Sequence, residues 1–370
     1  PSYTLIPTPS PMSAILTPAL PIAITRTSAS RLHEVDFDHI EFGKVFSDHM
    51  FVVHFRDGAW QTPAIVPYGD LSLSPATSAL HYGQAIFEGM KAHRQHDGRI
   101  VLFRPLDNLL RLNLSAERMC MPALPEELFM EGLKALVRLD ERWVPSAAGT
   151  SLYIRPFMFS TDGFVGVRPS NDYTFIIFTS PVNAYYSQPL RVRFEHHYVR
   201  AAEGGTGFAK AAGNYGGAME PTRRAQAEGY HQLLWLDAAE HRYIEESGTM
   251  NACFVIGDTL VTPAVSSSIL DGVTRRSVLA LARQWGVAVE ERRVSAAELV
   301  EALETGTLRE AFGCGTAATI APIAVIGDGH GRDYELPAWS ADSLGVRLGR
   351  TLDAIKAGTE PDVFGWLEAV

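Results

Sequence analysis

One lysine, Lys210, lies among small residues in the stretch GTGFAKAAGNYGG (205–217) and is one of only five lysines in the chain. The alanines around it supply no counter-charge, so an amine held there loses solvent, and the glycines let the backbone pass close to a flat ligand. A desolvated lysine amine is the nucleophile that forms Schiff bases with carbonyl compounds. Tyr215 and Asn214 offer a hydroxyl and an amide nearby. The pattern favours a carbonyl-bearing cofactor over the alternative of a solvated surface lysine.

Other chemistries fit the sequence less well. A phosphate-binding Walker loop needs Gly before its Lys and Ser or Thr after it, whereas Ala209 and Ala211 flank Lys210. The fragment GCGTAA (313–318) matches a relaxed dinucleotide fingerprint, but Pro322 and Gly327 interrupt the helix that should follow. A nicotinamide-dependent oxidoreductase therefore stays only as an alternative of a different class. No CxxC, HExxH or GxSxG pattern occurs, so we expect no metal and no serine nucleophile.

The overall composition is that of an ordinary globular protein. The chain has 370 residues, of which 46% are hydrophobic and 20% charged, and this length predicts two domains. A net charge of -10 without any basic run argues against nucleic acid as a partner. No apolar run approaches the roughly 18 residues of a membrane span, and the first 25 residues do not resemble a signal peptide. We therefore expect no membrane partner. Three cysteines far apart in the sequence fit a reducing compartment, so we expect a cytoplasmic protein.

The periodicity of apolar residues predicts an α+β protein of two halves. Strand-like alternation occurs at 49–55, 98–103, 150–159 and 172–182, and helical spacing at 108–121 and 126–144. Beyond these segments we expect a strand at 190–200, a hairpin at 231–247 and helices at 219–230, 275–286, 294–306 and 340–358. The predicted organisation is a loosely ordered extension (1–30), a small α/β domain (31–181), a linker (182–190) and a large domain (191–370).

Several segments occur together in one order: EFGKVFSDHM (41–50), HYGQAIFEGMKA (81–92), FRPLDNLLRL (103–112), SLYIRPF (151–157), GTGFAKAAGNYGG, IEESGTMN (244–251), DGVTR (271–275) and FGCGTAATIAP (312–322). This ordered set, from about Phe42 to the carboxyl terminus, closely resembles the fold-type IV pyridoxal phosphate enzymes, in particular the branched-chain amino acid aminotransferases. The resemblance implies a two-domain α+β fold with pyridoxal 5'-phosphate between the domains, and a homodimer or higher assembly.

The resemblance also implies the reaction. The expected activity transfers the amino group of leucine, isoleucine or valine to 2-oxoglutarate by a ping-pong mechanism, giving branched 2-oxo acids and L-glutamate. The partners would then be small amino and 2-oxo acids. Within the same fold, a D-amino acid aminotransferase or an aminodeoxychorismate lyase is the alternative.

The same resemblance assigns the cofactor contacts. Lys210 would form the Schiff base with the cofactor aldehyde and carry the proton between Cα and C4′. Glu246, rather than Glu245, would pair with the ring nitrogen, and Tyr215 with the ring hydroxyl. Arg111 would hold the phosphate as a bidentate cation. The remaining implied contacts come from the start of a helix and from two turns: Gly272, Val273, Thr274, Thr316 and Thr249.

The substrate pocket implied by the resemblance must accept both a bare alkyl chain and the γ-carboxylate of glutamate. Arg155, with tyrosine hydroxyls, would bind the γ-carboxylate, while the amides of Thr316 and Ala317 would face the substrate carboxylate. An aromatic box would take the alkyl chain, formed by Phe42, Tyr82, Tyr153, Tyr185 and, less directly, Tyr215. For Phe42 and Tyr185, ordinary packing is the alternative.

The sequence departs from the pattern of the family in two places, one at a single residue and one at a pair of residues. Asp271 stands where many relatives are expected to have proline, which affects the cup around the phosphate. Ala318 and Ala321 stand where some animal members carry a redox CxxC pair, so we expect no such thiol switch here.

Overall fold

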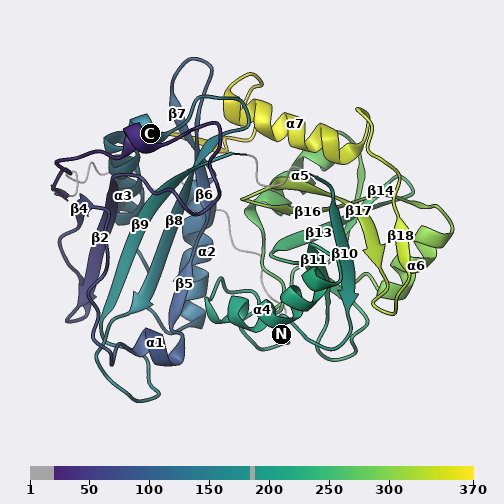
Figure 1. Cartoon of the computed structure of the whole chain (residues 1–370), viewed down its shortest axis with the longest axis horizontal. Coiled ribbons are helices and arrows are strands. Elements are labelled where there is room, and N and C mark those ends of the chain that lie inside the picture. The colour runs from purple at the N-terminus through teal and green to yellow at the C-terminus, as the bar shows by residue number, and fades with distance from the viewer. Residues whose placement is uncertain (1–20, 184–187) are drawn as a thin grey trace.

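The computed structural model describes residues 21–183 and 188–370 (Figure 1). The first half of the chain forms a ten-stranded sheet whose central pair, β8 and β9, is antiparallel over ten residues. The main order is β1-β4-β2-β9-β8-β6-β7-β19, with β3 beside β2 and β5 beside β8. The strands are β1 (Ala23–Ile24), β2 (His49–Arg56), β3 (Ala59–Trp60), β4 (Ala64–Pro67), β5 (Ala85–Phe87), β6 (Met90–Arg94), β7 (Ile100–Phe103), β8 (Ser151–Ser160), β9 (Tyr173–Val182) and β19 (Leu367–Ala369).

Helices α1 (Ser78–Tyr82), α2 (Pro105–Arg118) and α3 (Glu126–Leu139) accompany this sheet, with short 3-10 turns at Leu32–Glu34 and Glu141–Trp143. Helix α3 buries one apolar stripe against β2, and its Gly132 allows contact so close that a Cβ there would lie 2.5 Å from the ring of Phe51. Helix α2 begins with Pro105, whose missing N–H is not needed in a first turn. It lies between the first sheet and the second half of the molecule (Figure 1).

The second half forms a nine-stranded sheet in the order β12-β11-β10-β17-β16-β13-β14-β15, with β18 beside β17. Because β12 also pairs with β13, six of these strands close into a ring. The strands are β10 (Leu190–Glu195), β11 (Gln232–Leu236), β12 (Ile244–Ser247), β13 (Met250–Ile256), β14 (Thr259–Thr262), β15 (Ala288–Glu291), β16 (Leu308–Gly315), β17 (Thr319–Gly327) and β18 (Asp333–Glu335). The expected hairpin at 231–247 is present as the antiparallel pair β11–β12.

Four helices pack around the second sheet: α4 (Gly213–Ala227), α5 (Val273–Gln284), α6 (Ala296–Glu304) and α7 (Leu344–Ala357). Helices α5 and α7 share a core with β13 and β16, which includes the buried side chains of Leu279, Leu348, Leu352 and Phe312. Ser295 caps α6 by accepting a hydrogen bond from the N–H of Glu298. No helix within the described ranges is long and apolar enough to cross a membrane.

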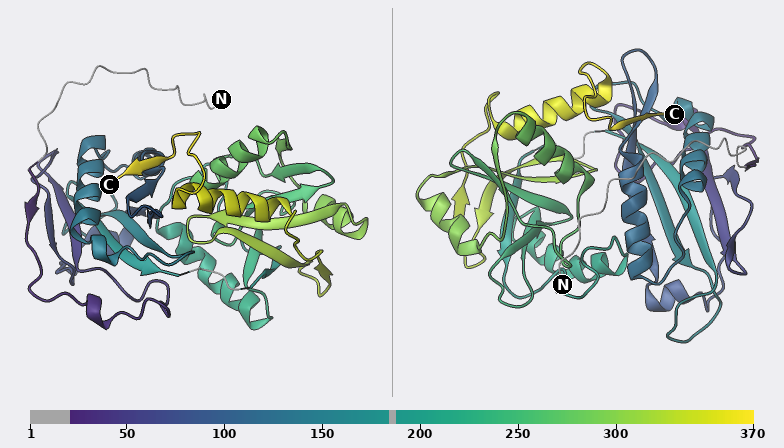
Figure 2. Two further views of the ribbon diagram at one scale, coloured as in Figure 1. Left: turned by 90° about the horizontal axis from the view of Figure 1, so that it is seen from above. Right: turned by 180° about the vertical axis from the view of Figure 1, so that it is seen from behind.

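The end of the chain returns to the first sheet. After α7, strand β19 pairs antiparallel with β7, so the last residues belong to the first sheet although the sequence predicted them in the second domain (Figures 1 and 2). At the other end, residues 1–20 of the predicted extension lie outside the described residues, while Ala23–Ile24 pair with β4. Within the predicted linker, β9 ends at Val182 and β10 begins at Leu190, and residues 184–187 also lie outside the described residues.

Candidate cofactor and substrate site

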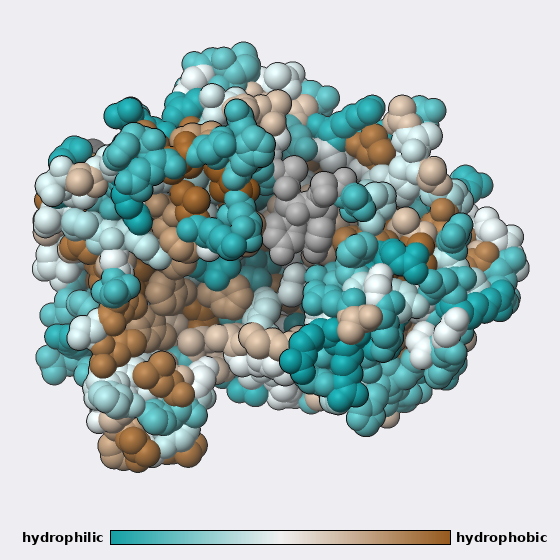
Figure 3. Space-filling view, viewed as in Figure 1, coloured by the Kyte–Doolittle hydropathy of each residue, from teal (hydrophilic) through white to brown (hydrophobic). Residues whose placement is uncertain are grey.

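A cavity of about 610 Å³ lies between the two halves and draws its walls from both. This volume lies within the range of small-molecule sites, about 300–1,000 Å³. Hydrophobic residues gather on the face of the first half that borders this junction (Figure 3). The cavity brings together most of the residues predicted for the site: Phe42, Arg111, Tyr153, Arg155, Lys210, Tyr215, Glu246, Thr249, Gly272, Val273, Thr274, Thr316 and Ala317.

Lys210 enters the cavity from a segment that is fixed to the first half. Its backbone N–H donates to Ser115 Oγ of α2 at 2.9 Å, and its carbonyl accepts from the N–H of Phe87 at 3.1 Å. The neighbouring Ala209 and Ala211 are buried in the core of the first half, which explains why small residues flank the lysine. The side chain is therefore presented from a rigid support.

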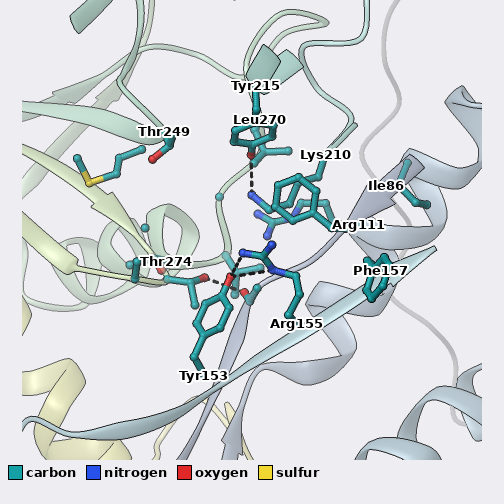
Figure 4. Close-up of a pocket in the computed structure, with 18 of the residues that line it drawn as sticks. Ile86, Arg111, Tyr153, Arg155, Phe157, Lys210, Tyr215, Thr249, Leu270 and Thr274 are labelled. Atoms are coloured by element: carbon teal, nitrogen blue, oxygen red, sulfur yellow. Dashed lines mark hydrogen bonds between the residues drawn. The ribbon is translucent and has the colours of Figure 1, made fainter. Parts of the chain in front are cut away.

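The amine of Lys210 has close partners that its local sequence does not reveal. Its Nζ donates to the hydroxyl of Tyr215 at 3.0 Å (Figure 4) and lies 4.9 Å from the centre of the Phe87 ring. Two buried carboxylates, Glu88 and Glu246, are near enough for the charge of Lys210 to act on them and favour their ionised forms. Lys210 thus has charged neighbours in the folded protein, although none lies beside it in the sequence.

Strand β12 separates the two adjacent glutamates. Successive side chains of a strand point to opposite faces. Glu246 lines the cavity and accepts a hydrogen bond from the N–H of Leu270 at 2.7 Å, with Arg200 Nη2 3.4 Å from its Oε1. Burial raises the pKa of Glu246, and Arg200 opposes that shift. Glu245 is outside the cavity lining and accepts from the hydroxyl of Ser268.

The amino-terminal end of α5 forms one wall of the cavity. Gly272 precedes the helix in an extended conformation. The first N–H groups of an α-helix have no intrahelical partner, and at α5 no side chain caps them. Such an end attracts anions through these donors and through the helix dipole. Gly272 cannot be replaced without rearrangement, because a Cβ there would lie 2.0 Å from Asn251 Oδ1.

Arg111 is held in place by a carboxylate and by a backbone carbonyl. Its Nε and Nη2 donate to the two oxygens of Glu88, each at 2.8 Å, and its Nη1 donates to the carbonyl of Asp271 at 3.0 Å. One N–H on each Nη atom remains for a ligand. Burial acts to raise the pKa of Glu88, but Arg111, together with Lys210 and Asn108, outweighs burial and the pKa is lowered. Sequence reasoning did not assign Glu88, although it lies in the quoted segment HYGQAIFEGMKA.

The turn between β16 and β17 carries Thr316 and Ala317, and the first half holds it in place. The hydroxyl of Thr316 donates to the carbonyl of Gly89 at 2.9 Å, and Lys91 Nζ donates to the carbonyl of Ala317 at 2.8 Å. The sequence analysis did not select Lys91, because no nearby residue indicates that it binds a turn more than 200 residues away.

The aromatic side of the cavity is made of first-half residues. Tyr153 accepts a hydrogen bond from Arg155 at 2.9 Å (Figure 4). Arg155 stacks over the Phe87 ring at 4.7 Å, and the ring of Phe42 lies 5.1 Å from that of Tyr153. The cavity also includes Phe157 and Phe178, which the sequence analysis did not select.

Two predicted members of the aromatic box are not brought into this wall. Tyr82 is the last residue of α1, is 40% exposed and does not line the cavity of its own chain. Gly83, with a φ of 65°, turns the chain after α1, so that Ile86 and Phe87 reach the cavity instead. The assignment of Tyr82 to the substrate pocket therefore stays a prediction. Tyr185 lies outside the described residues.

The chain belongs to the amino-transferase class IV family, whose model matches residues 85–326. It is 47% identical to the branched-chain-amino-acid transaminase 1 of Bacillus subtilis, over 90% of this chain and 94% of the relative. Among solved structures, it is similar to the branched-chain aminotransferase of Thermoproteus uzoniensis with norvaline, at a TM-score of 0.72 and 25% identity, covering 87% of this chain and 99% of the other. A second is the T.th. branched-chain amino acid aminotransferase complexed with N-(5'-phosphopyridoxyl)-L-glutamate, at a TM-score of 0.68 and 25% identity, covering 85% and 97%. The predicted family and fold are confirmed.

Proposed function

We propose that this protein is a pyridoxal 5'-phosphate-dependent transaminase that moves the amino group of leucine, isoleucine or valine to 2-oxoglutarate. The observation that carries the proposal is the meeting of Lys210, Glu246 and the uncapped start of α5 in one cavity. The predicted branched-chain transaminase activity and its cofactor are confirmed by the comparisons, because relatives that match nearly the whole chain are branched-chain aminotransferases.

The residues of the cavity fit this cofactor in each of its parts. The two unused N–H groups of Arg111 and the free amides of α5 suit a phosphate. A buried carboxylate, Glu246, suits a protonated ring nitrogen, while Tyr215 offers a hydroxyl to the ring oxygen. When bound, pyridoxal phosphate supplies an electron sink for the electrons released at the substrate α-carbon.

The protein side of the reaction then follows from these positions. The amine of Lys210 would hold the cofactor through its aldehyde and, once free, would serve as the base and acid that moves the substrate Cα proton. The hydroxyl of Tyr215 positions this amine at 3.0 Å. Glu246 keeps the ring nitrogen protonated, which stabilises the negative charge that develops during proton removal.

The aromatic side of the cavity can accept two different substrate side chains in one pocket. Phe42, Phe157 and Phe178 present apolar surface to a branched alkyl chain. Arg155 stays beside Tyr153 and Phe87, where it offers a cation to the γ-carboxylate of glutamate. We assign specificity for both substrates to this arrangement.

Replacing Arg155 by methionine should separate the two substrates. Methionine keeps apolar volume and removes the cation, so we expect KM for 2-oxoglutarate to rise on the order of 10- to 100-fold while KM for L-leucine changes less than about threefold. Steady-state kinetics with each substrate varied in turn measures both constants. The matched control is Arg309→Met, since Arg309 pairs with Asp258 at the surface and does not line the cavity. Equal losses for both substrates would contradict this assignment.

The activity itself is tested with a panel of amino donors and 2-oxoglutarate. L-Leucine, L-isoleucine and L-valine should be converted with formation of glutamate, and D-alanine and aminodeoxychorismate should not. Turnover of D-alanine alone would favour the D-amino acid aminotransferase alternative. A colourless protein that binds NADH would favour an oxidoreductase.

We further propose a homodimer in the cytoplasm. Exposed apolar residues cluster where Thr77 pairs with Gly163: Leu73, Leu80, Phe164, Val165 and Val167. An exposed cluster of this kind is typical of a protein–protein contact. Three cysteines without a disulfide are consistent with a reducing compartment. Light scattering that gives the mass of a single chain would argue against the dimer.

A further inference from the structure

A second, much smaller cavity of about 20 Å³ lies directly behind the wall that the proposed function assigns to the cofactor phosphate. Val273, Thr274 and Thr316 line both cavities. On the far side of the small cavity are three basic side chains from β6 and α7: Lys91, His93 and Lys356. The start of α5 is therefore backed by a basic cluster that does not itself line the cofactor cavity.

The charge of Arg111 is already balanced within the protein. Arg111 and Glu88 form a buried pair with two hydrogen bonds of 2.8 Å, and Glu88 also accepts from Asn108. Their charges sum to zero. Arg111 can still donate hydrogen bonds to a phosphate, but it cannot alone compensate the roughly two negative charges that a phosphate monoester carries near neutral pH.

The positive charges of Lys91 and Lys356, behind the wall, are not fully balanced by acidic side chains. Lys91 donates to the neutral carbonyl of Ala317, and none of the ion pairs found among the described residues includes it. Lys356 is buried, and its Nζ lies 3.3 Å from Asp353, whose side chain is 67% exposed and therefore well screened by water. His93 has no hydrogen-bond partner for its buried Nε2, and burial, followed by the charges of the two lysines, holds its pKa well below the ordinary value.

Burying two ammonium groups without a matching anion is unfavourable. Burial, together with the charge of Lys356, lowers the pKa of Lys91 to about 7, and burial also lowers the pKa of Lys356, while Asp353 opposes both shifts. An anion on the other side of the Thr274 and Thr316 wall would stabilise the charged forms of both lysines.

We propose that Lys91 and Lys356, although outside the cofactor cavity, supply the positive charge that balances the cofactor phosphate held at the start of α5. This inference rests on the proposed function, because it requires a phosphate-bearing cofactor. The two lysines would then act on the phosphate at long range through their charge, while Arg111 and the α5 amides make the direct contacts.

The test compares two ligands that differ only by the phosphate. Apo-protein of wild type, Lys356→Met and Lys91→Met is titrated with pyridoxal 5'-phosphate and with pyridoxal, and Kd is measured for each. Because both ligands carry the aldehyde that reacts with Lys210, the ratio of the two Kd values isolates the phosphate. Lys356→Met is the primary variant, since Lys91 also holds the Ala317 turn. Lys134→Met is the matched control, because Lys134 is mostly buried but is paired with Glu368 away from both cavities.

We expect each of the two variants to bind pyridoxal 5'-phosphate on the order of tenfold more weakly and pyridoxal unchanged. The melting temperature of the apo-protein should stay the same or rise in Lys356→Met, because an unbalanced buried charge is removed. Equal weakening for both ligands, or a Kd ratio that matches wild type and Lys134→Met, would overturn the inference and leave the proposed function intact. Failure of the wild type to bind pyridoxal 5'-phosphate would overturn both.

Discussion

The Lys210→Ala variant is expected to lose transamination of L-leucine by about four orders of magnitude or more. The substitution removes both the amine that holds the cofactor and the base that moves the proton, and each contribution alone is large. The kcat with saturating L-leucine and 2-oxoglutarate measures the loss. Borohydride reduction followed by peptide mass analysis should fix the cofactor to Lys210 in the wild type and to no peptide in the variant.

A small amine added to Lys210→Ala distinguishes lost chemistry from lost structure. Alanine leaves space where the lysine side chain was, so methylamine can enter and act as a base; the rate should rise with its concentration. The Lys134→Ala variant should keep kcat near wild type, because Lys134 lies on α3 and does not line the cavity. Activity of Lys210→Ala within tenfold of wild type, without added amine, would exclude Lys210 as the catalytic base.

The placement of the main site residues could be predicted because each lies in a short segment with its own local logic. Lys210 is framed by small residues that the fold needs for close packing against α2 and β5. Glu246 is separated from Glu245 by the alternation of a strand, which sequence spacing specifies once the strand is recognised. Gly272 and Thr274 mark a helix start whose amides remain free.

The sequence could not predict the contacts between segments that are far apart along the chain. Lys91 meets Ala317 across 226 positions, and Lys356 of α7 reaches the same region from near the end of the chain. Strand β19 joins the first sheet because the segment after α7 crosses back, and no local pattern encodes such a long-range pairing.

Replacing Glu246 by glutamine should slow proton removal on the order of 10²- to 10³-fold while the cofactor stays bound. Glutamine keeps the shape and the hydrogen bond to the N–H of Leu270 but carries no negative charge, so a protonated ring nitrogen loses its stabilising partner. The deuterium isotope effect on single turnovers with α-deuterated L-leucine should increase, because proton removal becomes more fully rate-limiting. Cofactor content per chain, measured by absorbance after alkaline release, should remain close to one.

The neighbouring Glu245→Gln variant is a closely matched control for this prediction. Glu245 is buried like Glu246 and lies near the same arginine, Arg200, but its side chain bonds to Ser268 on the opposite side of β12. Since it does not line the cavity, its substitution should change the single-turnover rate less than about fivefold, although it also removes a buried carboxylate. Comparable losses in both variants would mean that the charge near Arg200, rather than a contact with the ring nitrogen, governs the rate. A rate in Glu246→Gln near wild type would remove Glu246 from the reaction altogether.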